Sequence, residues 1–166
     1  MQLVAHIVDL APIDTAIVFG TPSSAVTAAP FQPSRFTFSA TNGQKVSLGA
    51  ITNTHAGPVS MRFLRPDGTQ LGATRTLDAS TSFLDPVRLD ATGTWVVEAV
   101  STAVPGGTLA IRLDSVVDIT ATIVPDGAAR SFVLTTPGQQ ASYTFIRSAG
   151  QPWRIRTALS SLGMMT

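Results

Sequence analysis

The chain has 166 residues and no cysteine, which excludes disulfides, thiolate metal sites and a cysteine nucleophile. Only two histidines occur, His6 and His55, and neither stands in a spacing typical of zinc ligands. A Ser-His-Asp triad through His55 would lack the G-x-S-x-G turn of one large hydrolase class. The sequence also has no phosphate-binding loop and no dinucleotide-binding fingerprint. These absences predict a protein that is not an enzyme and that binds no cofactor.

Charge is also scarce, since charged residues make up 13% of the chain, about half the usual share. The net charge is +1, so no overall field attracts the protein to nucleic acid. No run of about 18 apolar residues occurs, so no membrane span is predicted. Residues 1–20 lack a basic segment and contain two aspartates, and so do not look like a signal peptide. We therefore expect any export signal to lie outside this chain.

Carboxylates are few, and most of them stand where strands are expected to end. Asp67 lies in a Pro-Asp-Gly turn signal, and Asp90 precedes a turn that ends at Gly93. Turn formation is the favoured interpretation, and calcium held between loops of a sandwich is the alternative. Arg62 and Arg65 flank a strand end and are expected to face solvent.

The sequence is rich in short runs in which apolar and polar residues alternate, the pattern of a strand with one buried face. Turn signals containing glycine and proline separate these runs at roughly the 8-to-12-residue spacing of β-sandwiches. No segment keeps a helical period. The pattern predicts an all-β fold, an antiparallel β-sandwich of the jelly-roll type. The expected inward positions are Phe36, Phe38, Ala40, Val46, Leu48, Ala50, Val59, Met61, Phe63, Trp95, Val97, Ala99, Leu109, Ile111 and Leu113.

Among the aromatic residues, Phe83 is also assigned to the core. Phe31 lies between two prolines, Pro30 and Pro33, and is expected near the surface. There it would cover one end of the sandwich, or it would contact a neighbouring repeat.

An internal repeat appears when the chain is aligned with itself. Residues 14–53 align without a gap on residues 121–160, with ten identities. Gly20 falls on Gly127, and Phe38 falls on Phe145. We therefore expect the tail strands of a preceding repeat in residues 1–19, a complete sandwich in residues 20–125, and the opening strands of an incomplete repeat in residues 126–166.

The repeat resembles a known family. SATNGQKVSL (residues 39–48), RPDGT (65–69), FLDPVRL (83–89) and ATGTW (91–95) resemble the pre-peptidase C-terminal (PPC) type of bacterial β-sandwich. The resemblance covers nearly the whole chain, and it rests on turn and core motifs. It implies an exported module without catalytic function, located outside the cell or on its surface. No cluster of acidic residues matches a calcium site of such domains.

The favoured function is a structural or adhesive repeat module of an exported bacterial protein. Because the last repeat is incomplete, its strands are expected to have open edges that recruit strands from other copies of the chain, which would build a fibre. The residues expected to form this contact are Leu3, Val4, Ile7, Tyr143, Phe145, Trp153 and Ile155. The alternative is an accessory module of a secreted enzyme that binds polysaccharide, another polymer or calcium.

Overall fold

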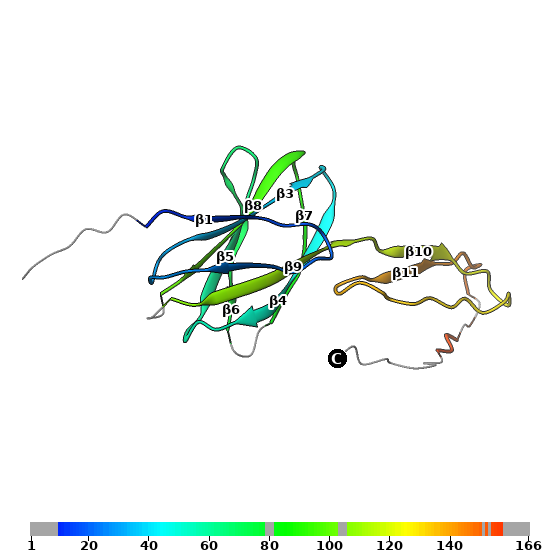
Figure 1. Cartoon of the computed structure of the whole chain (residues 1–166). Helices are drawn as coiled ribbons and strands as arrows, with labels where there is room; N and C mark the ends of the chain where they lie inside the picture. Colours follow the sequence, from blue (N-terminus) through cyan, green and yellow to red (C-terminus); the bar gives the residue numbers. More distant parts are fainter. Residues whose placement is uncertain (1–9, 79–81, 103–105, 151, 153, 158–166) are drawn as a thin grey trace, which may run out of the picture.

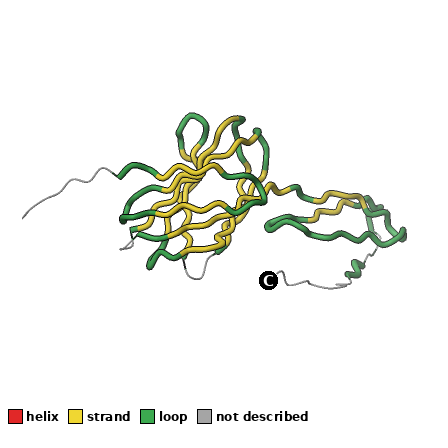
Figure 2. Tube along the Cα trace, viewed as in Figure 1, coloured by secondary structure: helices red, strands yellow, loops and turns green. Residues whose placement is uncertain are grey.

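The computed structural model describes residues 10–78, 82–102, 106–150, 152 and 154–157. The elements it contains are all β-strands, so the predicted all-β class is confirmed (Figures 1 and 2). In this part of the chain, no helix is long and apolar enough to cross a membrane.

Nine strands form a sandwich of two sheets (Figure 1). The five-stranded sheet has the order β1 (Ile13–Ala16), β3 (Ser34–Ala40), β8 (Gly93–Ser101), β5 (Val59–Leu64) and β6 (Gln70–Leu77). The four-stranded sheet has the order β2 (Ser23–Val26), β9 (Thr108–Val116), β4 (Lys45–Asn53) and β7 (Phe83–Arg88). Neighbouring strands are antiparallel except β1 and β3, which are parallel.

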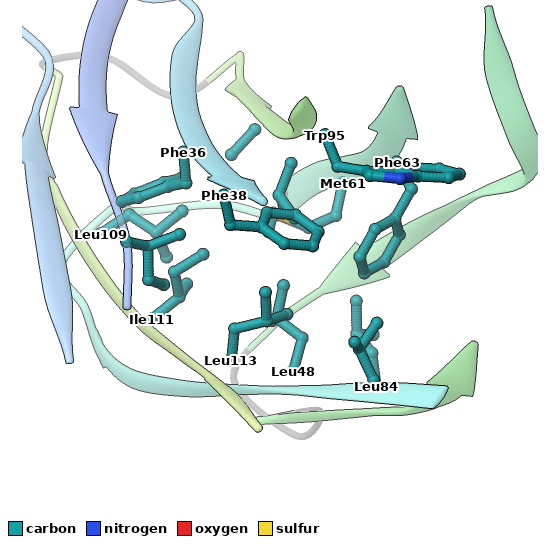
Figure 3. Packing of buried hydrophobic residues seen from close by; sticks show 14 of the residues in the cluster. Phe36, Phe38, Leu48, Met61, Phe63, Leu84, Trp95, Leu109, Ile111 and Leu113 are labelled. Atoms are coloured by element: carbon teal, nitrogen blue, oxygen red, sulfur yellow. The ribbon is translucent and has the colours of Figure 1, made fainter. Parts of the chain in front are cut away.

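The core lies between the two sheets, where the inward residues of alternating runs meet (Figure 3). Trp95, Phe36 and Ile111 are fully buried, and Phe38 packs edge-on against Phe19 with ring centroids 5.6 Å apart. Of the fifteen positions predicted to face inward, fourteen are buried, and Ala50 is partly buried against the core. Period-two spacing therefore identified the buried face of each of these strands.

Phe83 is not a core residue, contrary to the prediction. It is 37% exposed, whereas its neighbour Leu84 is 6% exposed. Leu84 pairs with Leu48 across β7 and β4 and points between the sheets. Because consecutive side chains of a strand point to opposite faces, Phe83 must point outward.

The predicted boundaries of the sandwich are also wrong at both ends. β1 was assigned to the tail of a preceding repeat, but it pairs with β3 inside the five-stranded sheet. β10 (Ile119–Thr122) was assigned to the complete sandwich, but it pairs in parallel with β11 (Ala141–Thr144) in a separate sheet. The sandwich therefore includes β1 and ends with β9. We call the described residues from 117 onward the arm, and Figure 1 shows it projecting to one side of the sandwich.

Candidate interaction surface

No group of three or more histidines and carboxylates that could hold a metal is found in the described residues. His55 lies beside Gly107, and its Nδ1 is buried with no hydrogen-bond partner in the part of the chain that is described. Burial lowers the pKa of His55. His6 lies outside the described residues.

The main charge cluster lies on the outer face of the five-stranded sheet. Glu98 on β8 has only 2% of its side chain exposed, and it accepts hydrogen bonds from Arg35 on β3 (2.9 Å) and Arg62 on β5 (2.7 Å). Burial would raise the pKa of Glu98, but these hydrogen bonds outweigh it and hold the pKa below its usual range. The strand order β3-β8-β5 thus produces a structural ion cluster.

Arg65, which follows β5, and Asp90, in the loop between β7 and β8, form a second ion pair. Nε and Nη2 of Arg65 lie 2.9 and 2.8 Å from the two carboxylate oxygens of Asp90, in a bidentate contact. The hydrogen bonds from Arg65 lower the pKa of Asp90. The sequence suggested that Arg62 and Arg65 face solvent, but Arg62 is bonded to Glu98 and Arg65 to Asp90. Asp67 accepts hydrogen bonds from Thr69, as expected for a turn residue.

The arm is joined to the sandwich by specific contacts. Lys45 Nζ on β4 lies 2.8 Å from both carboxylate oxygens of Asp118, and these hydrogen bonds lower the pKa of Asp118. The buried hydroxyl of Ser47 donates to the carbonyl oxygen of Pro137 (2.9 Å). Gly138 lies so close to Pro86 that a Cβ atom there would be 2.3 Å from Cγ of the proline. These contacts hold the loop around Pro137 against β4 and β7.

Backbone hydrogen bonds of the arm repeat those at the start of the sandwich. β10 and β11 pair in parallel as β1 and β3 do, and the bonds that flank the two pairs coincide. The matching bonds are Ile13 N–H to Pro33 O (2.8 Å) and Ile119 N–H to Gln140 O (2.8 Å); Ile17 to Thr37 (2.9 Å) and Ile123 to Thr144 (2.8 Å); Thr21 to Val18 (3.1 Å) and Gly127 to Val124 (3.0 Å); Gln32 to Ala29 (3.4 Å) and Gln139 to Thr136 (3.0 Å).

The two segments correspond in two different alignments. In the first, residues 11–21 match residues 117–127, so that Ala11 falls on Val117. In the second, residues 28–43 match residues 135–150, so that Gly43 falls on Gly150, as in the ungapped repeat. We call these the entry alignment and the loop alignment. They differ because the arm has one extra residue between Gly127 and Thr135.

The entry alignment changes the partner of one glycine. The structural partner of Gly20 (φ +78°) is Asp126 (φ +58°), and not Gly127 as the ungapped repeat indicated. Aspartate and glycine both tolerate this left-handed conformation. The identity of Gly20 and Gly127 is therefore not a structural equivalence.

The arm exposes large apolar side chains, and some of them stand at positions that the sandwich buries. Phe145 is 41% exposed, while Phe38 at the matching position is 4% exposed. Tyr143 is partly covered by Phe132, with ring centroids 5.7 Å apart. Ala121 and Tyr143 share one face of β10 and β11, while exposed hydroxyl side chains occupy the other. The exposed large apolar residues of the arm are Val117, Val124, Phe132, Val133, Leu134, Phe145, Ile146 and Ile155.

Neither a family model nor a curated protein matches the chain. Among solved structures it is similar to PliG of Salmonella Typhimurium, a periplasmic inhibitor of g-type lysozyme (17% identity, TM-score 0.46, covering 62% of this chain and 98% of that one). It is also similar to the pre-peptidase C-terminal domain of a collagenase from Bacillus anthracis (7% identity, TM-score 0.45, covering 66% and 100%). Likenesses at this level do not transfer either function to the chain.

Of the residues predicted to mediate assembly, three lie in the described part of the chain. Tyr143 is on β11, Phe145 follows it closely, and Ile155 is 64% exposed near the end of the arm. The other four, Leu3, Val4, Ile7 and Trp153, lie outside the described residues. The prediction missed Phe132, which packs against Tyr143. The apolar run at residues 132–134 was the available signal for it, but Phe132 aligns with a small residue, Ala25, in the ungapped comparison.

Proposed function

We propose that this protein is a non-catalytic structural or adhesive module of an exported bacterial protein, and that its arm accepts a β-strand from another copy of the chain. One observation carries the proposal. The arm forms the opening hydrogen bonds of a sandwich but leaves exposed the apolar side chains that the sandwich buries, as the pair Phe38 and Phe145 illustrates.

Unpaired backbone and exposed apolar side chains of the arm give this surface its chemistry. β3 is paired on both sides, by β1 and by β8, whereas β11 is paired only with β10 in the described part of the chain. An open edge exposes backbone N–H and C=O groups that pair with an added strand, and nearby apolar side chains supply the buried area. A patch of this kind on an otherwise well-packed protein is typical of an interaction site.

The sandwich itself suits a mechanical role. Its core spans both sheets, and the Glu98 cluster ties three strands of one sheet together on the outer face. The joint at Lys45, Ser47 and Gly138 holds the arm in a defined position, so that a strand bound to the arm would have a fixed direction relative to the sandwich. Export is part of the proposal because of the resemblance of residues 39–48 and 65–69 to the PPC-type modules of exported proteins.

Light scattering of the whole chain over a range of concentrations tests the proposal. The mass should rise with concentration, and the double variant Phe145→Thr/Ile155→Thr should lower it because both side chains are exposed in the arm at positions that the sandwich buries. The matched control is Val18→Thr/Ile51→Thr, which changes two exposed apolar residues of the sandwich. A chain that is monomeric at every concentration, or an equal effect of the control, would contradict the proposal.

A further inference from the structure

We propose that the strand accepted by the arm is residues 3–10 of a second copy, and that it takes the place that β9 has in the sandwich. This inference rests on the proposed function, and it adds the identity of the strand and its register. It predicts that Ile7 of one copy lies opposite Ile155 of the next.

The identity of the strand follows from the entry alignment. Gln32 and Gln139 donate their side-chain N–H groups to the carbonyls of Ala11 and Val117, so this alignment is fixed immediately after residue 10. Extended backward, it places residues 3–10 on residues 109–116 of β9. The inward residues of β9 are Leu109, Ile111, Leu113 and Val116, all of them at most 5% exposed. The residues that align with them are Leu3, Ala5, Ile7 and Leu10.

The receiving segments follow from the loop alignment. In the sandwich, β9 lies between β2 and β4 and pairs with both in antiparallel fashion. Gly43 (φ +85°) and Gly150 (φ +80°) have the same left-handed backbone conformation and match in this alignment. Gly43 stands just before β4, and Gly150 stands just before the last described residues of the arm. Residues 152–157 therefore correspond to the first half of β4. In the ungapped repeat, the run 130–133, which contains the exposed residues Phe132 and Val133, aligns with β2.

The register comes from the sandwich itself. Leu48 on β4 lies directly opposite Leu113 on β9. The corresponding residues are Ile155 in the arm and Ile7 in the incoming strand. Both are branched aliphatic residues, so the pairing buries apolar side chains at the position where the sandwich does so. A strand in the place of β9 does not pair with β11, because β9 belongs to the four-stranded sheet and β3, the counterpart of β11, belongs to the five-stranded sheet. The second edge of β11 therefore stays open to a further strand.

A second copy is the donor because of where the chain enters the sandwich. Figure 1 shows the start of the described chain, the blue segment that leads into β1, on the side of the sandwich opposite the arm. The contact between copies therefore joins two different surfaces, the arm of one and the strand preceding Leu10 of the next. A head-to-tail contact of this kind leaves a free strand at one end of the assembly and a free arm at the other, so that further copies add and a linear polymer forms.

Single-cysteine variants test the register, because the chain has no cysteine of its own. Opposite residues of an antiparallel pair have Cα atoms about 4.5–5.5 Å apart, within the range that a disulfide spans. Ile7→Cys chains mixed with Ile155→Cys chains should form disulfide-linked dimers under mild oxidation. The matched control pairs Val8→Cys with Ile155→Cys, since residue 8 would point to the opposite face. We expect the first pair to cross-link at least about tenfold faster than the control.

The outcomes separate the two proposals. Faster cross-linking of Ile7 with Ile155, with no dimer from either variant oxidised alone, supports the register. If light scattering shows assembly but both pairs cross-link at equal rates, the strand assignment is overturned while the proposed function stands. The assignment is also overturned if a chain without residues 1–9 assembles as well as the whole chain does. Absence of assembly would overturn both proposals.

Discussion

Gln32 and Gln139 make the same pair of hydrogen bonds at the two ends of the molecule. Each side-chain oxygen accepts the backbone N–H four residues earlier, from Ala28 (2.9 Å) and from Thr135 (2.8 Å). Each side-chain nitrogen donates to a backbone carbonyl on the strand-entry segment, Ala11 (3.1 Å) and Val117 (2.6 Å). Gln32 thus holds the loop between β2 and β3 against the segment that precedes β1. Gln139 holds the loop before β11 against the segment that precedes β10 in the same way.

Replacement of either glutamine by leucine removes both hydrogen bonds, but the consequences differ. Gln32→Leu should lower the free energy of unfolding by about 1–3 kcal/mol, since each lost hydrogen bond is worth about 0.5–1.5 kcal/mol. Gln139→Leu should leave the denaturation midpoint of the sandwich unchanged and speed amide exchange at Thr135. Urea denaturation and amide hydrogen exchange measure the two effects. An equal loss of sandwich stability in both variants would show that the arm and the sandwich unfold together.

Removing the arginine partners of Glu98 should lower the free energy of unfolding more than removing Glu98 itself. Its carboxylate is buried, whereas Arg35 and Arg62 have 40% and 46% of their side chains exposed and can return to water. Glu98→Ala should destabilise the sandwich by about 1–2 kcal/mol, and Arg35→Met/Arg62→Met by about 2–4 kcal/mol, because an unpaired buried charge is the larger penalty once the solvent screening of the arginines is considered. Urea denaturation at pH 7 measures both. The opposite order would mean that the carboxylate is hydrated.

The fold could be predicted because the signal for it is local. Phe36 and Phe38 stand two residues apart on one strand, and this spacing alone places them on the buried face. Phe83 was misassigned because a short, proline-containing run around it gives no clear phase. β1 was misassigned because its partner β3 is not its neighbour along the chain, and parallel pairing leaves no turn signal between them.

The candidate site was only partly predictable, for a different physical reason. An edge of β11 that no described strand covers was expected from the repeat. The entry alignment, in contrast, was hidden by one inserted residue and by the identity of Gly20 and Gly127. The Glu98 cluster and the joint at Lys45 and Asp118 depend on strand order, which period-two spacing does not contain. Contacts between residues 36 to 73 positions apart therefore needed the structure.

Acid should destabilise the sandwich through Glu98. Its pKa in the folded protein is below the ordinary value of 4.5, so the unfolded chain binds more protons near that pH. The stabilisation is fully present above about pH 4.5 and is lost as the pH falls through the lower, folded-state pKa. Urea midpoints measured from pH 7 to pH 3 should fall in the acid range, and Glu98→Gln should reduce the slope. Parallel curves for the two proteins would mean that other carboxylates produce the acid limb.

Gly138→Ala should detach the arm without unfolding the sandwich. The new Cβ atom would lie 2.3 Å from Cγ of Pro86, a contact that the rigid proline ring cannot relieve, so the loop must move off β7. Gly150→Ala is the matched control, because Gly150 has the same φ of +80° and no atom within 4 Å of the added Cβ. Both variants have the backbone strain of a left-handed alanine, about 1–2 kcal/mol, and only the first has the clash. Small-angle scattering of dilute protein should show a larger radius of gyration for Gly138→Ala alone, and amide exchange on β4 should be unchanged. An equal increase in both variants would attribute the effect to backbone strain and would remove the evidence for a fixed joint.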